Sequence, residues 1–429
     1  MRLRLTALSS SLRRVLAALA AIAAASCTTP APPPAAVAPQ PQPQPQPAAP
    51  LQCPPPEKPA CPAPTTPTPP VPEARGKLVP GAWGELTNWG VETLRPSLEA
   101  FVRSCTALEK QDAWKPVCGT ARTFAPDTPE TEIRSFFELN FDPWQVRNTD
   151  DTDSGMITGY YEPLLHGSLT RSARYRYPIY AVPDDLLVID LSSVYPDLKH
   201  KRLRGKLEGN RVVPYLSREE IDRDPAPLKG RELVWVDDEI DLFFLQIQGS
   251  GQVELPNGQR MRVGYADQNG HPFRSLGRAL IDSGQIPPEK ASMQGIKEWA
   301  RRHPRKVQEY LNTNPSYVFF RELPRDLPGP LGALGVPLTP ERSIAIDPRV
   351  IPLGVPVYLV TTWPNTSEPL DRLMVAQDTG GAIAGGVRAD FFWGFGDEAG
   401  ALAGRMRQAG RMWVLLPKGM APPDPAAPR

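Results

Sequence analysis

The sequence predicts a β-rich fold with peripheral helices. Its central and C-terminal parts contain many short apolar runs, rich in Val, Ile, Tyr and Phe, that alternate with polar residues as strands do. Turn sequences such as Pro256-Asn257-Gly258 and Gln268-Asn269-Gly270 lie between these runs. Strands and helices do not alternate regularly, which argues against a parallel β-α-β sheet. We therefore expect an all-β or β-rich architecture.

The N-terminal part of the folded region contains two segments with helical periodicity. The first covers 86–111 and is interrupted near Pro96, and the second covers 129–146, with Thr128 and Pro129 at its start. A strand with aromatic residues and glycine follows at 154–169. Further short strands are expected over 175–183, 210–216, 232–238, 241–255 and 259–267.

The remaining elements follow the same logic. Helices are expected over 273–284 and 293–304, the second of them stopped by Pro304. A helix with small residues on one face is expected over 397–410. The C-terminal strands are expected within 342–360, 371–381, 387–394 and 410–417.

The N-terminus has the features of an export signal. Residues 1–26 combine four arginines with a short apolar run that ends in small residues. Cys27 follows at once, which predicts a lipoprotein whose lipid is attached to Cys27, although an ordinary signal peptide cleaved near Ala25 is the alternative. Thr28, rather than Asp, after Cys27 fits sorting to the outer membrane, as in other lipoproteins.

A proline-rich tether follows, and its composition cannot form a core. Roughly two residues in five between Thr28 and Pro80 are proline, so we expect 27–80 to be an extended tether. The tail 420–429 is expected to be disordered. About 340 residues remain between 81 and 419, enough for two domains.

Charge and cysteine content exclude some functions. The net charge of +1 offers no basic surface, so nucleic acid is not an expected partner. Four cysteines besides Cys27 allow three disulfide connectivities, with Cys105–Cys118 and Cys53–Cys61 as the plausible local pairs. The four histidines are scattered, and no zinc-ribbon spacing occurs. We expect neither a metal nor a cofactor.

Three aspartates in the C-terminal part are candidates for chemistry. Asp347 and Asp378 each end a strand-like run, and Asp390 follows a glycine-rich loop. The alternative for each is a turn cap that accepts backbone N–H groups. Asp390 is the strongest candidate, since three aromatic residues, 391–393, follow it. Aromatic surroundings raise the pKa of a carboxyl group, as a general acid requires.

The triplet Asp378-Thr379-Gly380 also suggests an aspartic protease. Such an enzyme needs two carboxylates that share one proton, each in a turn preceded by bulky apolar residues. Ala376 and Gln377 precede Asp378 instead, and Gly381 lacks the hydroxyl expected after the triplet. The possible partner triplets begin at Asp153, in a polar run, and at Asp282, at a helix end. A protease is therefore the weaker hypothesis.

Several stretches occur together in this chain, among them GMITGYYEPLL, DLFFLQIQGSGQV, NGHPFRSLGRALIDSGQI, SIAIDPRVIPLGVPVYL and RLMVAQDTGGAI. Together they resemble one family, the membrane-bound lytic murein transglycosylases A. The resemblance runs from about 150 to 417 and is specific, because unrelated motifs occur in the family's order. The C-terminal part is also similar to the wider 3D domain, whose three aspartates correspond to Asp347, Asp378 and Asp390.

This resemblance implies a fold and a domain division. The fold should be a double-psi β-barrel formed by 81–160 and 325–419, with the 3D domain at about 340–417. A second β domain, 161–324, should be inserted, with glycan bound in the cleft between the two. The family's catalytic acid corresponds to Asp390 and its neighbour to Asp378. Asp347 is expected to support them, and candidate glycan contacts are Thr158, Tyr160, Gln248, Ser250, Gly380 and Gly381.

The resemblance also implies an activity. The family cleaves the β-1,4 bond between N-acetylmuramic acid and N-acetylglucosamine in peptidoglycan and leaves 1,6-anhydromuramoyl products. One carboxyl group suffices, first as acid and then as base, because the nucleophile is the C6 hydroxyl of the substrate. The expected binding partner is peptidoglycan. The protein is expected to be a monomer that a lipid on Cys27 anchors at the periplasmic face of the outer membrane. A non-catalytic glycan-binding module is the alternative from another class.

Overall fold

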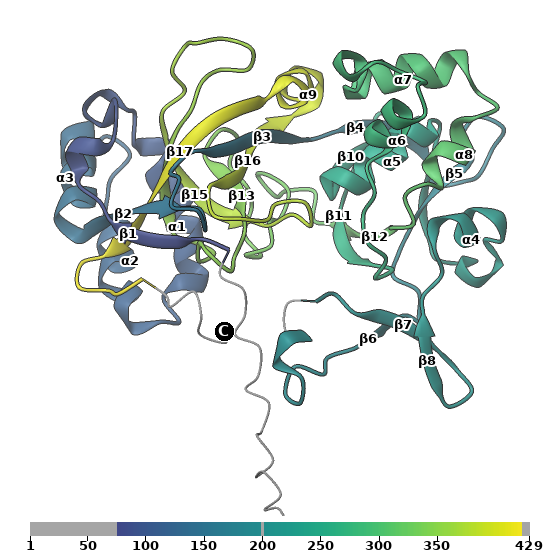
Figure 1. Ribbon diagram of the computed structural model, residues 1–429, viewed down its shortest axis with the longest axis horizontal. Coiled ribbons are helices and arrows are strands. Elements are labelled where there is room, and N and C mark those ends of the chain that lie inside the picture. The colour runs from purple at the N-terminus through teal and green to yellow at the C-terminus, as the bar shows by residue number, and fades with distance from the viewer. Residues whose placement is uncertain (1–74, 199–200, 423–429) are drawn as a thin grey trace, which may run out of the picture. The chain divides into compact units, whose positions relative to one another are not determined.

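The computed structural model describes residues 75–198 and 201–422, all within one compact unit, Thr68–Arg429. The predicted signal peptide 1–26, Cys27, the Cys53–Cys61 pair and nearly all of the tether lie outside the described residues. Within this described part, no helix is both long and apolar enough to cross a membrane. The expected β-rich architecture with peripheral helices is confirmed (Figure 1).

The largest sheet contains eight strands, six of which close into a ring. The pairing order is β1-β2-β17-β14-β15-β13-β16-β3, and β17 pairs with β3 as well. The ring is therefore β17-β14-β15-β13-β16-β3, built from segments far apart in the sequence. The strand bounds are β1 Lys77–Pro80, β2 Phe141–Arg147, β3 Gly155–Glu162, β13 Ser343–Ile346, β14 Pro356–Val360, β15 Arg372–Asp378, β16 Arg388–Phe395 and β17 Arg407–Pro417.

Two expectations about the start of the folded region need correction. Residues 77–80, predicted as the end of the tether, form β1 and pair with β2. The segment 129–146, predicted as one helix, forms helix α3 (Glu130–Asn140) and then strand β2. Pro143 has no N–H to donate inside a helix, and pairing of β2 with both β1 and β17 stabilises the strand instead.

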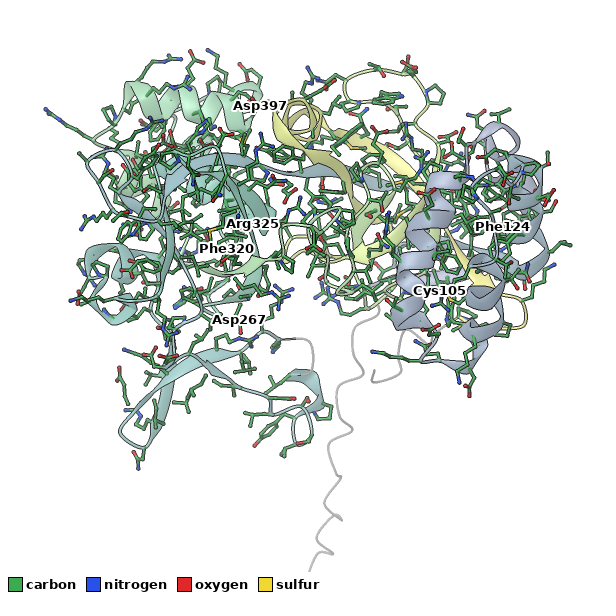
Figure 2. All side chains as sticks on the ribbon, turned by 180° about the vertical axis from the view of Figure 1, so that it is seen from behind. Cys105, Phe124, Asp267, Phe320, Arg325 and Asp397 are labelled. Carbon is green, nitrogen blue, oxygen red and sulfur yellow. A yellow bond between two sulfur atoms is a disulfide. The ribbon has the colours of Figure 1, made fainter. Side chains whose placement is uncertain are left out.

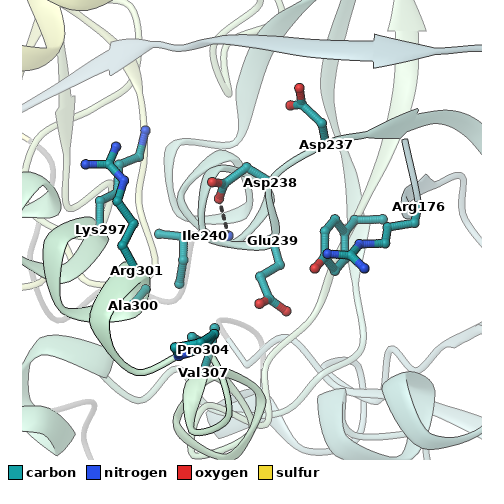
Figure 3. A pocket seen from close by; sticks show the side chains of 11 residues that line it. Arg176, Asp237, Asp238, Glu239, Ile240, Lys297, Ala300, Arg301, Pro304 and Val307 are labelled. Atoms are coloured by element: carbon teal, nitrogen blue, oxygen red, sulfur yellow. Dashed lines mark hydrogen bonds between the residues drawn. The ribbon is translucent and has the colours of Figure 1, made fainter. Parts of the chain in front are cut away.

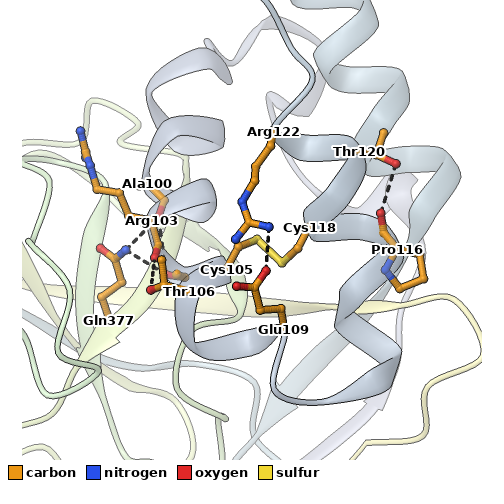
Figure 4. Close-up of a disulfide and its surroundings, with 11 residues drawn as sticks. Ala100, Arg103, Cys105, Thr106, Glu109, Pro116, Cys118, Thr120, Arg122 and Gln377 are labelled. Atoms are coloured by element: carbon orange, nitrogen blue, oxygen red, sulfur yellow. Dashed lines mark hydrogen bonds and ion pairs between the residues drawn. A yellow bond between two sulfur atoms is a disulfide. The ribbon is translucent and has the colours of Figure 1, made fainter.

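In the described part of the chain, four α-helices pack against this sheet or against one another. They are α1 (Arg95–Leu108), α2 (Lys115–Ala121), α3 and α9 (Gly396–Arg405). A disulfide joins Cys105 of α1 to Cys118 of α2, which is one of the two plausible local pairs (Figures 2 and 4). Nearby, the fully buried Gln377 of β15 donates to the Ala100 carbonyl and to Ser104 Oγ of α1, both at 2.9 Å. Helix α1 is thus fixed to the strand that ends in Asp378.

The residues between β3 and β13 form a second β structure with its own core. A six-stranded sheet has the order β12-β11-β10-β4-β9-β5, and three strands form a separate ribbon, β6-β7-β8. The strand bounds are β4 Leu164–Ser168, β5 Tyr177–Tyr180, β6 Leu187–Val188, β7 Arg204–Glu208, β8 Arg211–Pro214, β9 Glu232–Val236, β10 Ser250–Glu254, β11 Arg260–Gln268 and β12 Val318–Leu323.

Five α-helices that the structure describes lie in the same part of the sequence as this second sheet. The α-helices are α4 Arg218–Arg223, α5 Glu239–Gln248, α6 Leu276–Asp282, α7 Met293–Arg302 and α8 Val307–Leu311. The 3-10 helices of the described residues are η1 Trp83–Glu85, η2 Trp89–Val91, η3 Asp112–Trp114, η4 Pro196–Leu198, η5 Ala226–Leu228 and η6 Pro288–Lys290.

A further correction concerns 241–255, predicted as one strand. Its first half is helix α5, and only Ser250–Glu254 is a strand. Asp238 caps the helix by accepting the N–H groups of Ile240 and Asp241, and Gly249, at φ +78°, ends it. A helix this short and this buried presents a continuous apolar run, which periodicity alone cannot distinguish from a strand.

Candidate active site

Strand pairing places Asp378 and Asp390 on either side of one small residue. Strand β13 lies between β15 and β16, and Ala345 of β13 is the register partner of both Asp378 and Asp390. Register partners point to the same face of a sheet. Neighbouring strands lie about 4.8 Å apart, so the two aspartate Cα atoms are about 10 Å apart. Ala345 itself is buried and packs with Tyr160 and Phe392 in a small apolar cluster beside the two aspartates.

Asp390 has an environment suited to a general acid. Burial raises its pKa to about 6, against the opposing effects of a hydrogen bond from Thr158 and the charge of Arg388, and with a contribution from Asp378. Thr158, its register partner on β3, donates to Asp390 Oδ1 at 2.6 Å. Among the described residues, none makes a hydrogen bond to Asp390 Oδ2. That oxygen is therefore available for a substrate.

Asp378 is bound more completely than Asp390. Its Oδ1 accepts the backbone N–H groups of Ala333 and Thr379, both at 2.9 Å, and its Oδ2 accepts the Tyr160 hydroxyl at 3.0 Å. Burial raises the pKa of Asp378, while these three donors oppose the increase. Burial, together with the charge of Asp378, also raises the pKa of Tyr160 and keeps its hydroxyl protonated as a donor.

Asp347 has a different environment, although it follows the same central strand. Its side chain is almost fully buried and receives two hydrogen bonds from the Arg349 guanidinium, each at 2.7 Å. It also accepts the N–H of Gly385 at 2.9 Å. Burial acts to raise the pKa of Asp347, but the hydrogen bonds from Arg349 and Gly385 hold it below its usual value. Asp347 is an ionised group that ties the glycine-rich loop to the end of β13.

The other predicted glycan contacts lie in different places. Gln248, at the end of α5, accepts the Tyr161 N–H through Oε1 at 3.0 Å, so it contacts β3 next to Tyr160. Ser250 is buried at the start of β10. Gly380 and Gly381 lie in the loop after β15, and an added Cβ would meet nothing at Gly381 but would lie 2.8 Å from Ile383 at Gly380.

Two residues near the acid pair, Asp378 and Asp390, were not predicted from the sequence. Arg388 donates to Thr158 Oγ1 at 2.9 Å and so belongs to the hydrogen-bonded group around Asp390. Its position two residues before Asp390 in one strand places both on the same face, and that period-two signal was present in the sequence. Ala345 had no such signal, because its position follows only from the pairing of three strands.

The contacts of Asp378 and of the two possible partner triplets bear on the aspartic-protease hypothesis. The partners of Asp378 are Tyr160 and two backbone amides, whereas Asp153 is bonded to Gln145 and Asp282 is paired with Arg278. In the part of the chain that the structure describes, no group of three or more His, Cys, Asp and Glu residues is placed to hold a metal ion.

The structure also has a pocket beside α5 and α7 that contains none of the three aspartates (Figure 3). It is lined by apolar residues and by charged side chains of both signs, among them Glu239 and Arg301. Lys297, which also lines it, is already paired with Asp241. The pocket is therefore a separate feature from the acid pair.

Comparisons with known proteins give a consistent assignment. Residues 156–321 match the MltA specific insert domain and residues 342–416 match the 3D domain. The chain is 33% identical to membrane-bound lytic murein transglycosylase A of Escherichia coli K12 over 291 residues, which are 66% of this chain and 72% of that protein.

Solved structures agree with the sequence matches. The crystal structure of MltA from Neisseria gonorrhoeae is similar with a TM-score of 0.69 and 41% identity, covering 81% of this chain and 94% of that one. E. coli MltA with bound chitohexaose is similar with a TM-score of 0.58 and 28% identity, covering 80% and 94%. The chain therefore belongs to the family of membrane-bound lytic murein transglycosylase A.

Proposed function

We propose that this protein is a lytic transglycosylase that cleaves the β-1,4 bond between N-acetylmuramic acid and N-acetylglucosamine in peptidoglycan and leaves 1,6-anhydromuramoyl ends. The observation that carries the proposal is Asp390, a carboxyl group with a pKa of about 6 and one oxygen that makes no hydrogen bond to a described residue. Membership of the family supports it. So does the E. coli relative that is described with bound chitohexaose, an oligosaccharide of linked amino sugars.

In the first step, protonated Asp390 acts as the general acid. Its proton passes from Oδ2 to the glycosidic oxygen, and the bond from that oxygen to C1 of the muramic acid breaks. Positive charge develops at C1 and the ring oxygen. A carboxyl group with a pKa of about 6 is still protonated in about one molecule in ten at pH 7, far more often than an ordinary aspartate, and is acidic enough to transfer its proton.

In the second step, the same group acts as base. The Asp390 carboxylate takes the proton of the C6 hydroxyl while the C6 oxygen forms a bond to C1. This closes the 1,6-anhydro ring and returns Asp390 to its protonated form. The nucleophile is part of the substrate, so its effective concentration is high and no water is consumed.

Asp378 stabilises the positive charge that develops between the steps. Its carboxyl group lies on the same face of the sheet as Asp390, and three donors favour its ionised form against the opposing effect of burial. An inverting hydrolase is a second candidate, because Asp378 and Asp390 are register partners of the same residue and could act as a pair on a water molecule. Asp378 is poorly suited to activate that water, since both of its oxygens already accept hydrogen bonds. The single acid/base is therefore the better supported mechanism.

We further infer the arrangement around this site. The ring of six strands agrees with a double-psi β-barrel formed by 81–160 and 325–419, with 161–324 as the inserted domain. Glycan would bind in the cleft between these domains, against Gly380 and Gly381 and near Gln248 and Ser250. Asp347 supports the site as a structural carboxylate.

We also propose a membrane location for the protein. Processing of 1–26 and lipidation of Cys27 would anchor a monomer at the periplasmic face of the outer membrane. Radiolabelled palmitate should be incorporated into the wild-type chain and not into Cys27→Ala. Incorporation that is equal in the two would contradict the assignment of Cys27.

The activity is tested on labelled peptidoglycan sacculi. The wild type and Asp127→Asn, which changes an exposed carboxylate, should both release soluble label. Asp390→Asn should bind the sacculi but release none. Binding by the wild type without any release would instead indicate a non-catalytic glycan-binding module. Equal release by Asp390→Asn and the wild type would contradict the role of Asp390.

A further inference from the structure

The two oxygens of Asp390 are not equivalent. Thr158 donates to Oδ1 at 2.6 Å, whereas Oδ2 makes no hydrogen bond to any described residue. A protonated carboxyl group carries its proton on one oxygen only. Which oxygen this is decides whether the acid can reach the glycosidic bond.

Arg388 determines how the Thr158 hydroxyl is oriented. A guanidinium can only donate, and Arg388 donates to Thr158 Oγ1 at 2.9 Å. The hydroxyl proton must then point elsewhere, and Asp390 Oδ1 is its only acceptor in the described part of the chain. A proton on Oδ1 would face this hydroxyl proton, and turning the hydroxyl away would leave its proton without an acceptor. The proton of Asp390 is therefore disfavoured on Oδ1.

The backbone keeps Arg388 in place. Its guanidinium also donates to the carbonyls of Met156 at 3.2 Å and Ala389 at 2.5 Å, on strands β3 and β16. These strands pair in parallel, with Arg388 opposite Met156 and Asp390 opposite Thr158. Arg388, Thr158 and Asp390 are thus arranged by one stretch of regular strand pairing rather than by a loop.

We propose that Arg388 and Thr158 are positioning residues that hold the acidic proton of Asp390 on Oδ2. This inference rests on the proposed function for its use in catalysis, but it concerns a property of the protein alone. Neither residue exchanges a proton with the substrate. Arg388 orients Thr158, and Thr158 in turn occupies Oδ1.

The same arrangement serves both steps of the reaction. When Asp390 gives its proton to the glycosidic oxygen, the resulting carboxylate keeps its hydrogen bond from Thr158 on Oδ1. The proton of the C6 hydroxyl then returns to Oδ2, where the next turnover needs it. Without this constraint a fraction of the carboxyl groups would carry the proton on Oδ1, where it faces Thr158.

The inference is tested by NMR titration of the Asp390 side chain in the full chain labelled with ¹³C at aspartate carboxyl carbons, its signal assigned by Asp390→Asn. The wild type should titrate with a pKa of about 6. Thr158→Val removes the donor to the ionised form and should raise the pKa of Asp390 by about one pH unit. Thr158→Ser keeps the hydroxyl and should restore the wild-type value. A Thr158→Val variant with the wild-type pKa would overturn the proposal.

Arg388→Met tests the second member of the pair. It removes both the orienting donor and a nearby positive charge, so the pKa of Asp390 should also rise. Combining it with Thr158→Val should raise the pKa less than the sum of the two single changes, because the pair acts as a unit. Strict additivity would show that Arg388 acts through its charge alone and would overturn its orienting role.

Kinetics connect this property to the reaction. On sacculi, Thr158→Val should lower kcat on the order of tenfold with little change in KM, and the pH at which activity declines should move upward with the pKa of Asp390. A change confined to KM would show that Thr158 is a glycan contact and would contradict its positioning role. If the NMR shifts occur but the wild type releases no anhydro products, the proposed function fails while the assignment of the proton stands.

Discussion

Asp347 and Asp390 occupy comparable places in the C-terminal region but have opposite properties. Both lie at or beside strand β13. Asp347 is almost fully buried and Asp390 is half-buried. Asp347 is paired with Arg349 through two hydrogen bonds, and its pKa is lowered. From the residues that the structure describes, Asp390 accepts a single hydrogen bond, from the Thr158 hydroxyl to Oδ1, and its pKa is raised to about 6. Burial is common to the two groups, so it is the partner that separates a structural carboxylate from a candidate acid.

The largest expected effect comes from Asp390→Asn. It replaces the acid by an amide of the same shape, and lytic activity should fall on the order of a thousandfold. At neutral pH the free energy of unfolding of Asp390→Asn should exceed that of the wild type by about 1–3 kcal/mol, because the variant lacks a carboxyl group that is costly to ionise in the folded protein. Unfolding in guanidinium chloride measures the stability, and release of label from sacculi measures the activity. An inactive variant that is less stable at neutral pH would contradict this explanation.

Asp347→Asn should have the reverse pattern. Removing one partner of the ion pair leaves Arg349 without its carboxylate, which should cost about 2 kcal/mol, less than for a fully buried pair because Arg349 is partly exposed. Activity measured well below the melting temperature should fall only a few-fold. If stability is unchanged and activity is lost, Asp347 belongs with the reacting groups and the comparison fails.

The pH dependence separates the same two groups. Asp347 has a lowered pKa in the folded state, so its contribution to stability is present above the unfolded pKa and is lost as pH falls through the folded value. Asp390 binds more protons when folded, so its effect lowers stability as pH rises from about 4 to 6. Lytic activity should decline about tenfold per pH unit well above pH 6, since only protonated Asp390 is competent. A flat profile from pH 6 to 9 would exclude Asp390 as the acid.

The smallest effect is expected from Tyr160→Phe. It removes one of three donors to Asp378 and should raise the pKa of that carboxyl group. Activity should decrease about two- to tenfold, consistent with one neutral hydrogen bond. A loss as large as that of Asp390→Asn would mean that Tyr160 takes a direct part in proton transfer.

Much of the site was predictable because its residues lie in short contiguous stretches. The position of Asp390 before three aromatic residues indicated a desolvated carboxyl group, and its raised pKa agrees. Thr158 and Tyr160 were expected to contact glycan. That contact stays a prediction. The structure shows in addition that Thr158 is bonded to Asp390 and Tyr160 to Asp378, which the sequence did not indicate because the register between β3 and β16 is a property of the folded chain.

The errors in the fold have identifiable physical causes. Helix α5 was predicted as a strand because a continuous apolar run fits both structures. Strand β2 was predicted as a helix because the apolar periodicity of α3 continues into it, and its pairing with β1 and β17 is non-local. The disulfide between Cys105 and Cys118, by contrast, was predicted as one of two plausible local pairs, and the structure confirms it.

The central claim is that Asp390 alone serves as acid and base, with the C6 hydroxyl as nucleophile. It is tested most directly by the mass of the products that the wild type and Asp390→Asn release from purified sacculi. The wild type should yield muropeptides that lack one water relative to hydrolysis products, and Asp390→Asn should yield none above background. Products with reducing ends from the wild type, or anhydro products undiminished in Asp390→Asn, would contradict the account.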